Sequence, residues 1–175
     1  MTNLQNEKLL VRLVSAANET ELYGIDTQTI ADICLFSSLI DTKKFHKASR
    51  VIKQFFEHLT VYIHHNHDSL SRTISRRASQ NLILGFSQAK QGSDATWVCL
   101  LQYLSLSLNR ELKVKAQLQK PDVISLIVAL ADRKVFDKTI WTILLKTLNA
   151  MISQLQMEEI CLVMKSLRQI RLKSD

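Results

Sequence analysis

The sequence contains very little glycine and proline, with three glycines and one proline in 175 residues. Because the tight turns of β-rich folds depend on such residues, this scarcity argues against a β-sandwich or barrel and favours an all-α protein. A glycine-rich phosphate-binding loop is also excluded, since Gly24, Gly85 and Gly92 stand far apart.

Catalytic motifs are missing as well. There is no Gly-x-Ser-x-Gly, no His-Glu-x-x-His and no pair of carboxylates placed for acid–base work. The adjacent Glu158 and Glu159 open a predicted helix, where the helix dipole explains them better. The sequence therefore predicts no catalytic residue and no cofactor, and a small helical enzyme has no constellation to support it.

Long apolar runs and secretory features are missing too. No uninterrupted run approaches the roughly 20 residues of a membrane span, and MTNLQNEKLL lacks the apolar core of a signal peptide. It also lacks an arginine-rich presequence, so any organellar import signal is expected to be internal, already removed or absent. Cys34, Cys99 and Cys161 are odd in number and lie in apolar helical runs, which predicts reduced core residues of an intracellular protein.

The composition is that of a globular protein, at 46% hydrophobic and 22% charged residues. At this length we expect one domain over residues 1–175. The net charge of +7 and the pI near 9.5 favour a polyanionic partner such as nucleic acid or an anionic membrane surface. A basic protein without such a partner is the alternative.

The clearest structural signal is a helical hairpin over residues 121–148. Pro121 suits a first helical turn, and Val123, Leu126, Ile127 and Leu130 follow at the spacing of one helix face. After a short polar turn, Asp137 is a plausible N-cap for a second helix that continues to residue 155. Two amphipathic helices joined this closely must be antiparallel and share an apolar seam.

The same reasoning predicts about eight helices in the whole chain. The HHNHD segment at residues 64–68 is expected to be an interhelix loop, and a polar connector is expected at residues 109–120. The predicted helices cover residues 4–17, 27–40, 45–63, 70–89, 97–108, 121–131, 138–155 and 157–172.

An internal repeat is suggested by four similar segments, which superpose on Leu39, Phe86, Leu130 and Leu167 at intervals of 47, 44 and 37 residues. Trp97 and Trp141 are also 44 residues apart. Such periods are typical of α-solenoids, so we expect a short right-handed α-solenoid of stacked antiparallel hairpins. Generic periodicity among helices of similar length is the alternative.

The segments SLIVALADRKVFDKTIWTIL and NLILGFSQAKQGSDATWVCL resemble the degenerate helical repeats of FAST-kinase-like and RAP-type organellar RNA proteins, of the heptatricopeptide or octotricopeptide kind. The resemblance covers roughly residues 30–172. It implies RNA binding or ribonucleoprotein assembly in mitochondria or plastids. The sequence differs from that family in having no recognisable RAP domain and only three to four hairpins. HEAT-like adaptor repeats are the competing interpretation.

One cluster suggests metal binding: His64, His65 and His67 with Asp68. Adjacent residues rarely converge on a zinc ion without distant ligands, so we expect a polar segment and no metal site.

Basic residues recur near helix ends and predicted turns, and stacking would align them into a stripe that tracks RNA phosphates without reading bases. Solvated helix ends are the alternative interpretation of each group. The residues expected to bind RNA are Lys43, Lys44, Lys47, Arg50, Arg76, Arg77, Arg133, Lys134, Lys138, Arg168 and Arg171.

The sequence thus predicts a non-enzymatic, RNA-associated structural protein. We expect it in an organellar ribonucleoprotein such as the mitochondrial ribosome, with rRNA and protein subunits as partners and no small-molecule substrate. The alternative is a HEAT-like protein–protein adaptor without RNA contact.

Overall fold

The computed structural model describes residues 11–12, 14–17, 22–40, 46–113 and 118–171. The side chains of residues 23, 46–48, 111–113 and 171 lie outside this description. The described residues form helices joined by short turns, with no strand, so the all-α prediction is confirmed.

In the part of the chain that the structure describes, eight α-helices follow the short helical pieces at residues 11–12 and 14–17. Short 3₁₀ turns, η1 (Leu22–Gly24) and η2 (Ile152–Gln154), precede α2 and α9. The α-helices are α2 (Thr27–Ser38), α3 (His46–His65), α4 (His67–Thr73), α5 (Arg76–Gln88), α6 (Asp94–Lys113), α7 (Lys120–Asp132), α8 (Lys138–Ala150) and α9 (Met157–Arg171).

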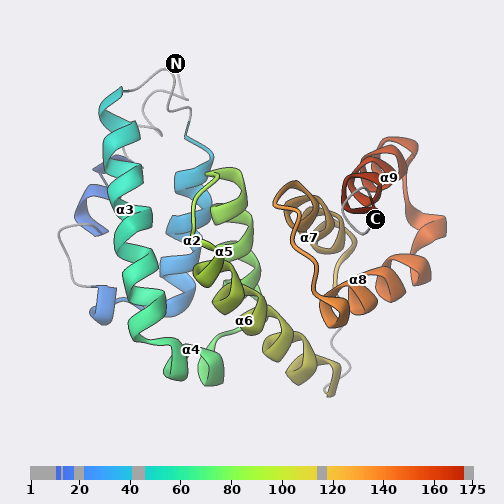
Figure 1. The fold of residues 1–175 in the computed structure, drawn as a ribbon, viewed down its shortest axis with the longest axis horizontal. Helices are drawn as coiled ribbons and strands as arrows, with labels where there is room; N and C mark the ends of the chain where they lie inside the picture. The colour runs from blue at the N-terminus through green and yellow to red at the C-terminus, as the bar shows by residue number, and fades with distance from the viewer. Residues whose placement is uncertain (1–10, 13, 18–21, 41–45, 114–117, 172–175) are drawn as a thin grey trace.

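The helices pack in two rows. In the first row α5 lies between α2 and α7, and α7 packs in turn on α9. In the second row α6 contacts both α3 and α8, while the short α4 packs beside α6. Figure 1 shows α2 and α3 at one end of the molecule and α9 at the other. Successive helices of the first row, α2, α5, α7 and α9, therefore contact one another in chain order.

The apolar core lies between the two rows. Phe56 of α3 meets Phe86 of α5 edge to face, with ring centroids 5.0 Å apart. Trp97 of α6 and Trp141 of α8 are both buried, at 3% and 4% exposure. Edge-to-face rings and large buried side chains of this kind dominate the energetics of a helical core, which explains why each hairpin needs its neighbours.

The closest approach between helices is made by Gly85 of α5 against Cys34 of α2. A Cβ atom placed on Gly85 would lie 2.5 Å from Cys34 Sγ and 2.9 Å from its carbonyl carbon and oxygen. Only glycine permits this contact, because any side chain would meet backbone atoms. The α2–α5 contact is the most extensive between any two described helices.

The predicted helix over residues 70–89 is wrong as one element, because it is split into α4 and α5. Ile74 and Ser75 have extended ψ angles of 131° and 158°. The Ser75 hydroxyl caps α5 by accepting from the Ala78 N–H at 3.0 Å. Arg110 of α6 donates to the carbonyls of Arg72 and Ile74. The break is therefore stabilised at both of its ends, one of them by a long-range contact.

Three other boundaries also differ from expectation. The HHNHD segment is not a loop, since α3 runs through His65 and α4 starts at His67. The helix α6 continues to Lys113, into the expected connector, whereas α8 ends at Ala150 and the 3₁₀ turn η2 follows. The predicted first helix covers residues 4–17, of which residues 4–10 and 13 lie outside the described residues.

The cysteines are only in part the core residues that were expected. Cys34 is fully buried, Cys99 is half-buried and Cys161 is exposed on α9. Burial raises the pKa of the Cys34 thiol far above its ordinary value, and raises that of Cys99 as well.

Candidate functional site

The turns that join α5 to α6 and α7 to α8 have the same geometry. Lys90 and Lys134, which are 44 residues apart, both adopt the left-handed conformation, with φ of 55° and 54°. After each lysine the next N–H donates back to the helix, from Gln91 to the Phe86 carbonyl and from Val135 to the Leu130 carbonyl, both at 3.0 Å. This is the Schellman ending of a helix.

A tryptophan closes each of these turns from the following helix. The Trp97 indole N–H donates to the Gln91 carbonyl at 3.2 Å, and the Trp141 indole N–H donates to the Val135 carbonyl at 3.1 Å. The N-caps correspond too, Ser93 for α6 and Asp137 for α8. The predicted N-cap role of Asp137 is confirmed. Every one of these features is repeated after 44 residues.

Arg133 joins the two turns to one another. Its guanidinium carbon lies 5.0 Å from the centroid of the Trp97 ring, and its Nη2 donates to the Gly92 carbonyl at 3.2 Å. A cation over an indole face is attracted by the negative π surface. Arg133 therefore holds the second turn beside the first, and its guanidinium is used within the protein.

Four lysines lie at these two turns or line the groove beside the first of them, and we call them the turn edge. Lys90, Lys134 and Lys138 are exposed at the two turns. Lys53 of α3 and Lys90 line the same groove of about 630 Å³ between the ends of α2, α3 and α5. Lys53 also makes a 3.8 Å ion pair with Glu57, which contributes little because both side chains are exposed. The turn edge consists of Lys53, Lys90, Lys134 and Lys138.

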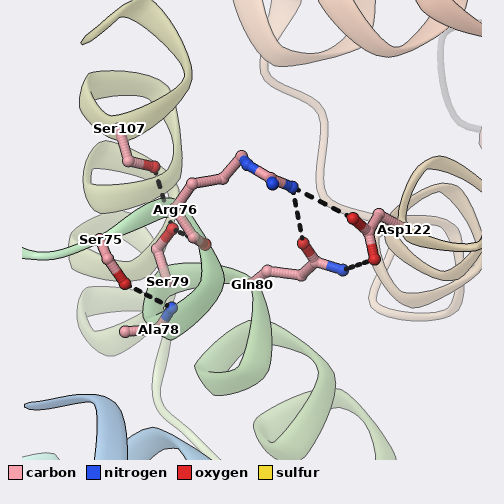
Figure 2. A network of polar contacts seen from close by, with 7 residues as sticks. All are labelled: Ser75, Arg76, Ala78, Ser79, Gln80, Ser107 and Asp122. Carbon is pink, nitrogen blue, oxygen red and sulfur yellow. Dashed lines mark hydrogen bonds and ion pairs between the residues drawn. The ribbon is translucent and has the colours of Figure 1, made fainter. Parts of the chain in front are cut away.

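A second polar cluster connects the first-row helices (Figure 2). Arg76 of α5 forms a 3.1 Å ion pair with Asp122 of α7. Gln80 contacts both members of the pair, accepting from Arg76 at 3.5 Å and donating to Asp122 at 2.9 Å. Ser79, one turn of α5 away, shares a buried hydrogen bond with Ser107 of α6 at 3.0 Å. The cluster therefore fixes α5 to both α7 and α6.

An equivalent ion pair joins α7 to α9. Lys120 lies 2.9 Å from Glu159, and these residues occupy the register positions of Arg76 and Asp122. The Gln156 backbone N–H and the Lys120 ammonium hold the pKa of the Glu159 carboxyl below its ordinary value. Lys120 and Glu159 are thus a second copy of the same interhelix contact.

Beside the cluster of Arg76, Gln80 and Asp122 lies a groove of about 500 Å³ between α2, α5 and α7. Its lining combines apolar and polar side chains, among them the exposed Phe36 and Arg77. Asp32 on its wall accepts hydrogen bonds from Gln28 at 2.7 Å and from Asn81 at 2.6 Å. No arrangement of nucleophile and base is present among the described residues of this groove.

The structure brings together only some of the basic residues expected to bind RNA. Lys134 and Lys138 lie together on the turn edge, Arg77 lies in the groove, and Arg50 and Arg168 are exposed on α3 and α9. Arg76 and Arg133 make the intramolecular contacts described above. Lys43 and Lys44 lie outside the described residues, and the side chains of Lys47 and Arg171 lie outside the described side chains.

Lys90 was missed by the sequence reasoning, although the 44-residue register places it opposite Lys134. The signal is the alignment of QAKQG (88–92) with DRKVF (132–136), in which Lys90 matches Lys134 but stands outside any run of basic residues.

The histidine cluster has structural contacts. His67 stacks on Tyr103 with ring centroids 5.4 Å apart, and its Nδ1 lies 3.0 Å from the Tyr103 hydroxyl. His64 Nε2 lies 3.3 Å from Thr96 Oγ1. Within the described residues, no three histidine, cysteine or acidic side chains are grouped as metal ligands.

Comparison with known proteins gives no relative: no family model matches this sequence, and neither a curated protein nor a solved structure is significantly similar to it. In the described part of the chain, no helix combines the length and apolarity that a membrane crossing requires. The fold and the site thus define an all-helical protein with a repeated hairpin and a lysine-lined edge.

Proposed function

We propose that this protein is a non-enzymatic component of a ribonucleoprotein and that the turn edge contacts RNA phosphates. The observation that carries the proposal is the pair of exposed lysines, Lys90 and Lys134, at one position of two equal turns. Arg133 holds these turns side by side, so the two lysines lie at neighbouring turns. A row of cations suits a polyanion whose charges are themselves regularly spaced.

The conformation of these lysines supports a functional reason for their presence. Glycine is the usual residue at the left-handed position after a helix, and an L-residue there costs roughly 1–2 kcal/mol. A cation near a helix C-terminus recovers about 0.3–1 kcal/mol from the helix dipole. The balance still favours glycine, so retaining lysine twice is consistent with selection for its charge.

The net charge of +7 supports the same partner class. The organellar setting, including the mitochondrial ribosome, rests on the resemblance of the helical segments to organellar RNA proteins. Contacts from lysine ammonium groups to phosphates would position RNA without reading its sequence.

Salt dependence of binding to a fluorescein-labelled oligouridine tests the proposal. Four phosphate contacts predict a slope of about −2.8 in log K against log salt for single-stranded RNA. The double variant Lys90→Gln with Lys134→Gln is expected to reduce the size of that slope by about 1.4.

The matched control is Lys146→Gln with Lys165→Gln, which removes the same charge from exposed positions outside the turn edge. If both double variants lower the slope equally, binding depends on overall charge and the turn edge is not the site. An absence of RNA binding at low salt would overturn the proposal.

A protein–protein adaptor without RNA contact is the second candidate. The groove between α2, α5 and α7 favours it, because exposed Phe36 lies in a mixed polar and apolar lining. Helical-repeat proteins commonly bind partners along such a surface. Loss of a protein partner in a Phe36→Ala variant, with RNA binding absent in the wild-type protein, is the result that would favour this candidate.

A further inference from the structure

Successive first-row helices use the same positions to contact the next helix. Arg76 of α5 and Lys120 of α7 are equivalent, and each pairs with an acidic residue of the following helix, at 3.1 and 2.9 Å. Ser87 lies on the same face near the end of α5, and its hydroxyl donates to the Ala129 carbonyl of α7 at 3.2 Å. These contacts define a stripe of four positions that faces the next helix.

The stripe is covered in α5 and α7. Its central positions are Gln80 and Ile83 in α5, at 6% and 0% exposure, and Ile124 and Ile127 in α7, at 7% and 0%. Its last positions, Ser87 and Ala131, are also buried. The full stripes are Arg76, Gln80, Ile83 and Ser87 in α5, and Lys120, Ile124, Ile127 and Ala131 in α7.

On α9 the same four positions are exposed. They are Met157, Cys161, Met164 and Arg168, and we call them the end face. Met157 is 72% exposed and Met164 is 63% exposed. The side of α9 that faces α7 is covered, with Val163 at 4%. Figure 1 shows α9 at the far end of its row, and no described helix packs on the end face.

We propose that the end face binds an amphipathic helix of a partner protein, packed on α9 as α7 packs on α5. The partner helix places apolar side chains over Met157, Cys161 and Met164 and a carboxylate beside Arg168. Flexible methionines adapt to a helix from another chain better than branched residues do. This proposal does not depend on RNA binding, because the end face and the turn edge share no residue.

Charge determines the kind of partner. The first position of the stripe is a cation in α5 and α7, and it pairs with an acidic residue of the next helix. In α9 the first position is Met157, and the cation, Arg168, is at the last position. An incoming helix therefore needs an apolar residue in place of the acid and an acid about two turns later. A second copy of this chain, with its net charge of +7, is disfavoured because it brings like charge to Arg168 and Lys165.

A redesigned α7 peptide tests this arrangement. The probe is a synthetic peptide of residues 119–135 that carries Asp122→Leu, to meet Met157, and Ala129→Glu, to meet Arg168. A staple on its solvent side keeps it helical, since isolated helices of this length are marginal in water. The unmodified α7 peptide with the same staple is the control peptide.

We expect the redesigned peptide to bind the full chain at least tenfold more tightly than the control peptide. Met164→Glu in the protein is expected to weaken binding tenfold or more, since a buried apolar contact is lost. Val98→Glu on α6 is the matched control, because Val98 is also 63% exposed, and it is expected to leave binding unchanged. Arg168→Glu should remove the preference for the redesigned peptide.

Circular dichroism on each variant checks that the helices remain folded. Binding that Met164→Glu does not weaken, or no binding at millimolar peptide, would overturn the proposal. Sedimentation equilibrium tests whether a second copy of the chain covers the end face instead. A dimer that Met164→Glu dissociates would show this, and it would also overturn the proposal.

Discussion

At the scale of single residues, the repeat is most evident in Lys90 and Lys134. Both are left-handed, both precede a residue whose carbonyl accepts from a tryptophan, and both are exposed. Trp97 and Trp141 are buried as seam residues, so stacking on a nucleic-acid base is not their role. The exposed lysines carry charge, whereas the buried tryptophans hold the shape of the turn.

Replacing Lys134 by glycine should stabilise the protein. Relief of the left-handed conformation outweighs loss of the helix-dipole interaction, so we expect the free energy of unfolding to rise by about 0.5–1 kcal/mol. Urea denaturation measures this change. RNA affinity should fall in the same variant, because the ammonium group is gone.

The same substitution at Lys146, within α8, is the control. There glycine should lower the free energy of unfolding by about 1 kcal/mol through its poor helix propensity. A Lys134→Gly variant that is destabilised to the same degree would show that no strain is relieved at the turn.

At the scale of helices, the closest fit is between α2 and α5. Gly85 allows the backbones to approach until the Cys34 carbonyl would touch a Cβ atom. Asn81 of α5 and Ser75 at its N-cap also reach α2, through hydrogen bonds to Asp32 and Gln28. The Ser38 hydroxyl at the end of α2 also donates to Gln88 of α5 at 2.7 Å, so the register of this helix pair is held by one close contact and three polar ones.

Gly85→Ala should destabilise the protein despite the better helix propensity of alanine. Overpacking against backbone costs roughly 1–3 kcal/mol, and alanine recovers about 1 kcal/mol at most. We expect a net loss of about 1–2 kcal/mol in the free energy of unfolding, measured by urea denaturation.

Gly24→Ala is the matched control, because among the described residues no atom beyond its chain neighbours lies within 4 Å of a Cβ placed there. That variant should stay within about 0.5 kcal/mol of wild type. Equal stability of the Gly85 and Gly24 variants would contradict the close contact.

At the scale of the whole molecule, contacts run between neighbours along each row. Helix α5 has partners on both sides, whereas α9 packs mainly on α7 and exposes Met157 and Met164. In repeat architectures, stability depends on the interfaces that each unit makes with its neighbours. An end unit with one partner opens more readily than a central unit.

Native-state hydrogen exchange should follow this order. We expect the slowest amide exchange in α5 and α7 and faster exchange in α9, because α9 opens without disturbing the other interfaces. Mass spectrometry of peptic fragments measures the difference. Equal protection of α9 and α5 would indicate that the rows open as one cooperative unit. Protection of α9 should rise when the redesigned peptide is bound.

Local pattern was sufficient for much of the architecture. Scarce glycine and proline argued against β folds, apolar periodicity located most helices, and Asp137 was recognisable as an N-cap, which the structure confirms. The 44-residue spacing of Trp97 and Trp141 identified two equivalent hairpins. These features depend on neighbours a few residues away, and for that reason one sequence was enough to predict them.

Tertiary structure decided which charged residues remain exposed. Nothing near Arg76 or Arg133 in the sequence indicates that Asp122, Gly92 and Trp97 hold their guanidinium groups. The break at Ser75 also depends in part on Arg110 from another helix. Such partners come from distant parts of the chain, so the exposure of a basic side chain depends on the whole fold and cannot be predicted from its sequence neighbours. The sequence alone predicted most of the helices and the 44-residue equivalence of two hairpins, while the packing of the rows determined which basic side chains stay exposed and left Met157 and Met164 of α9 exposed.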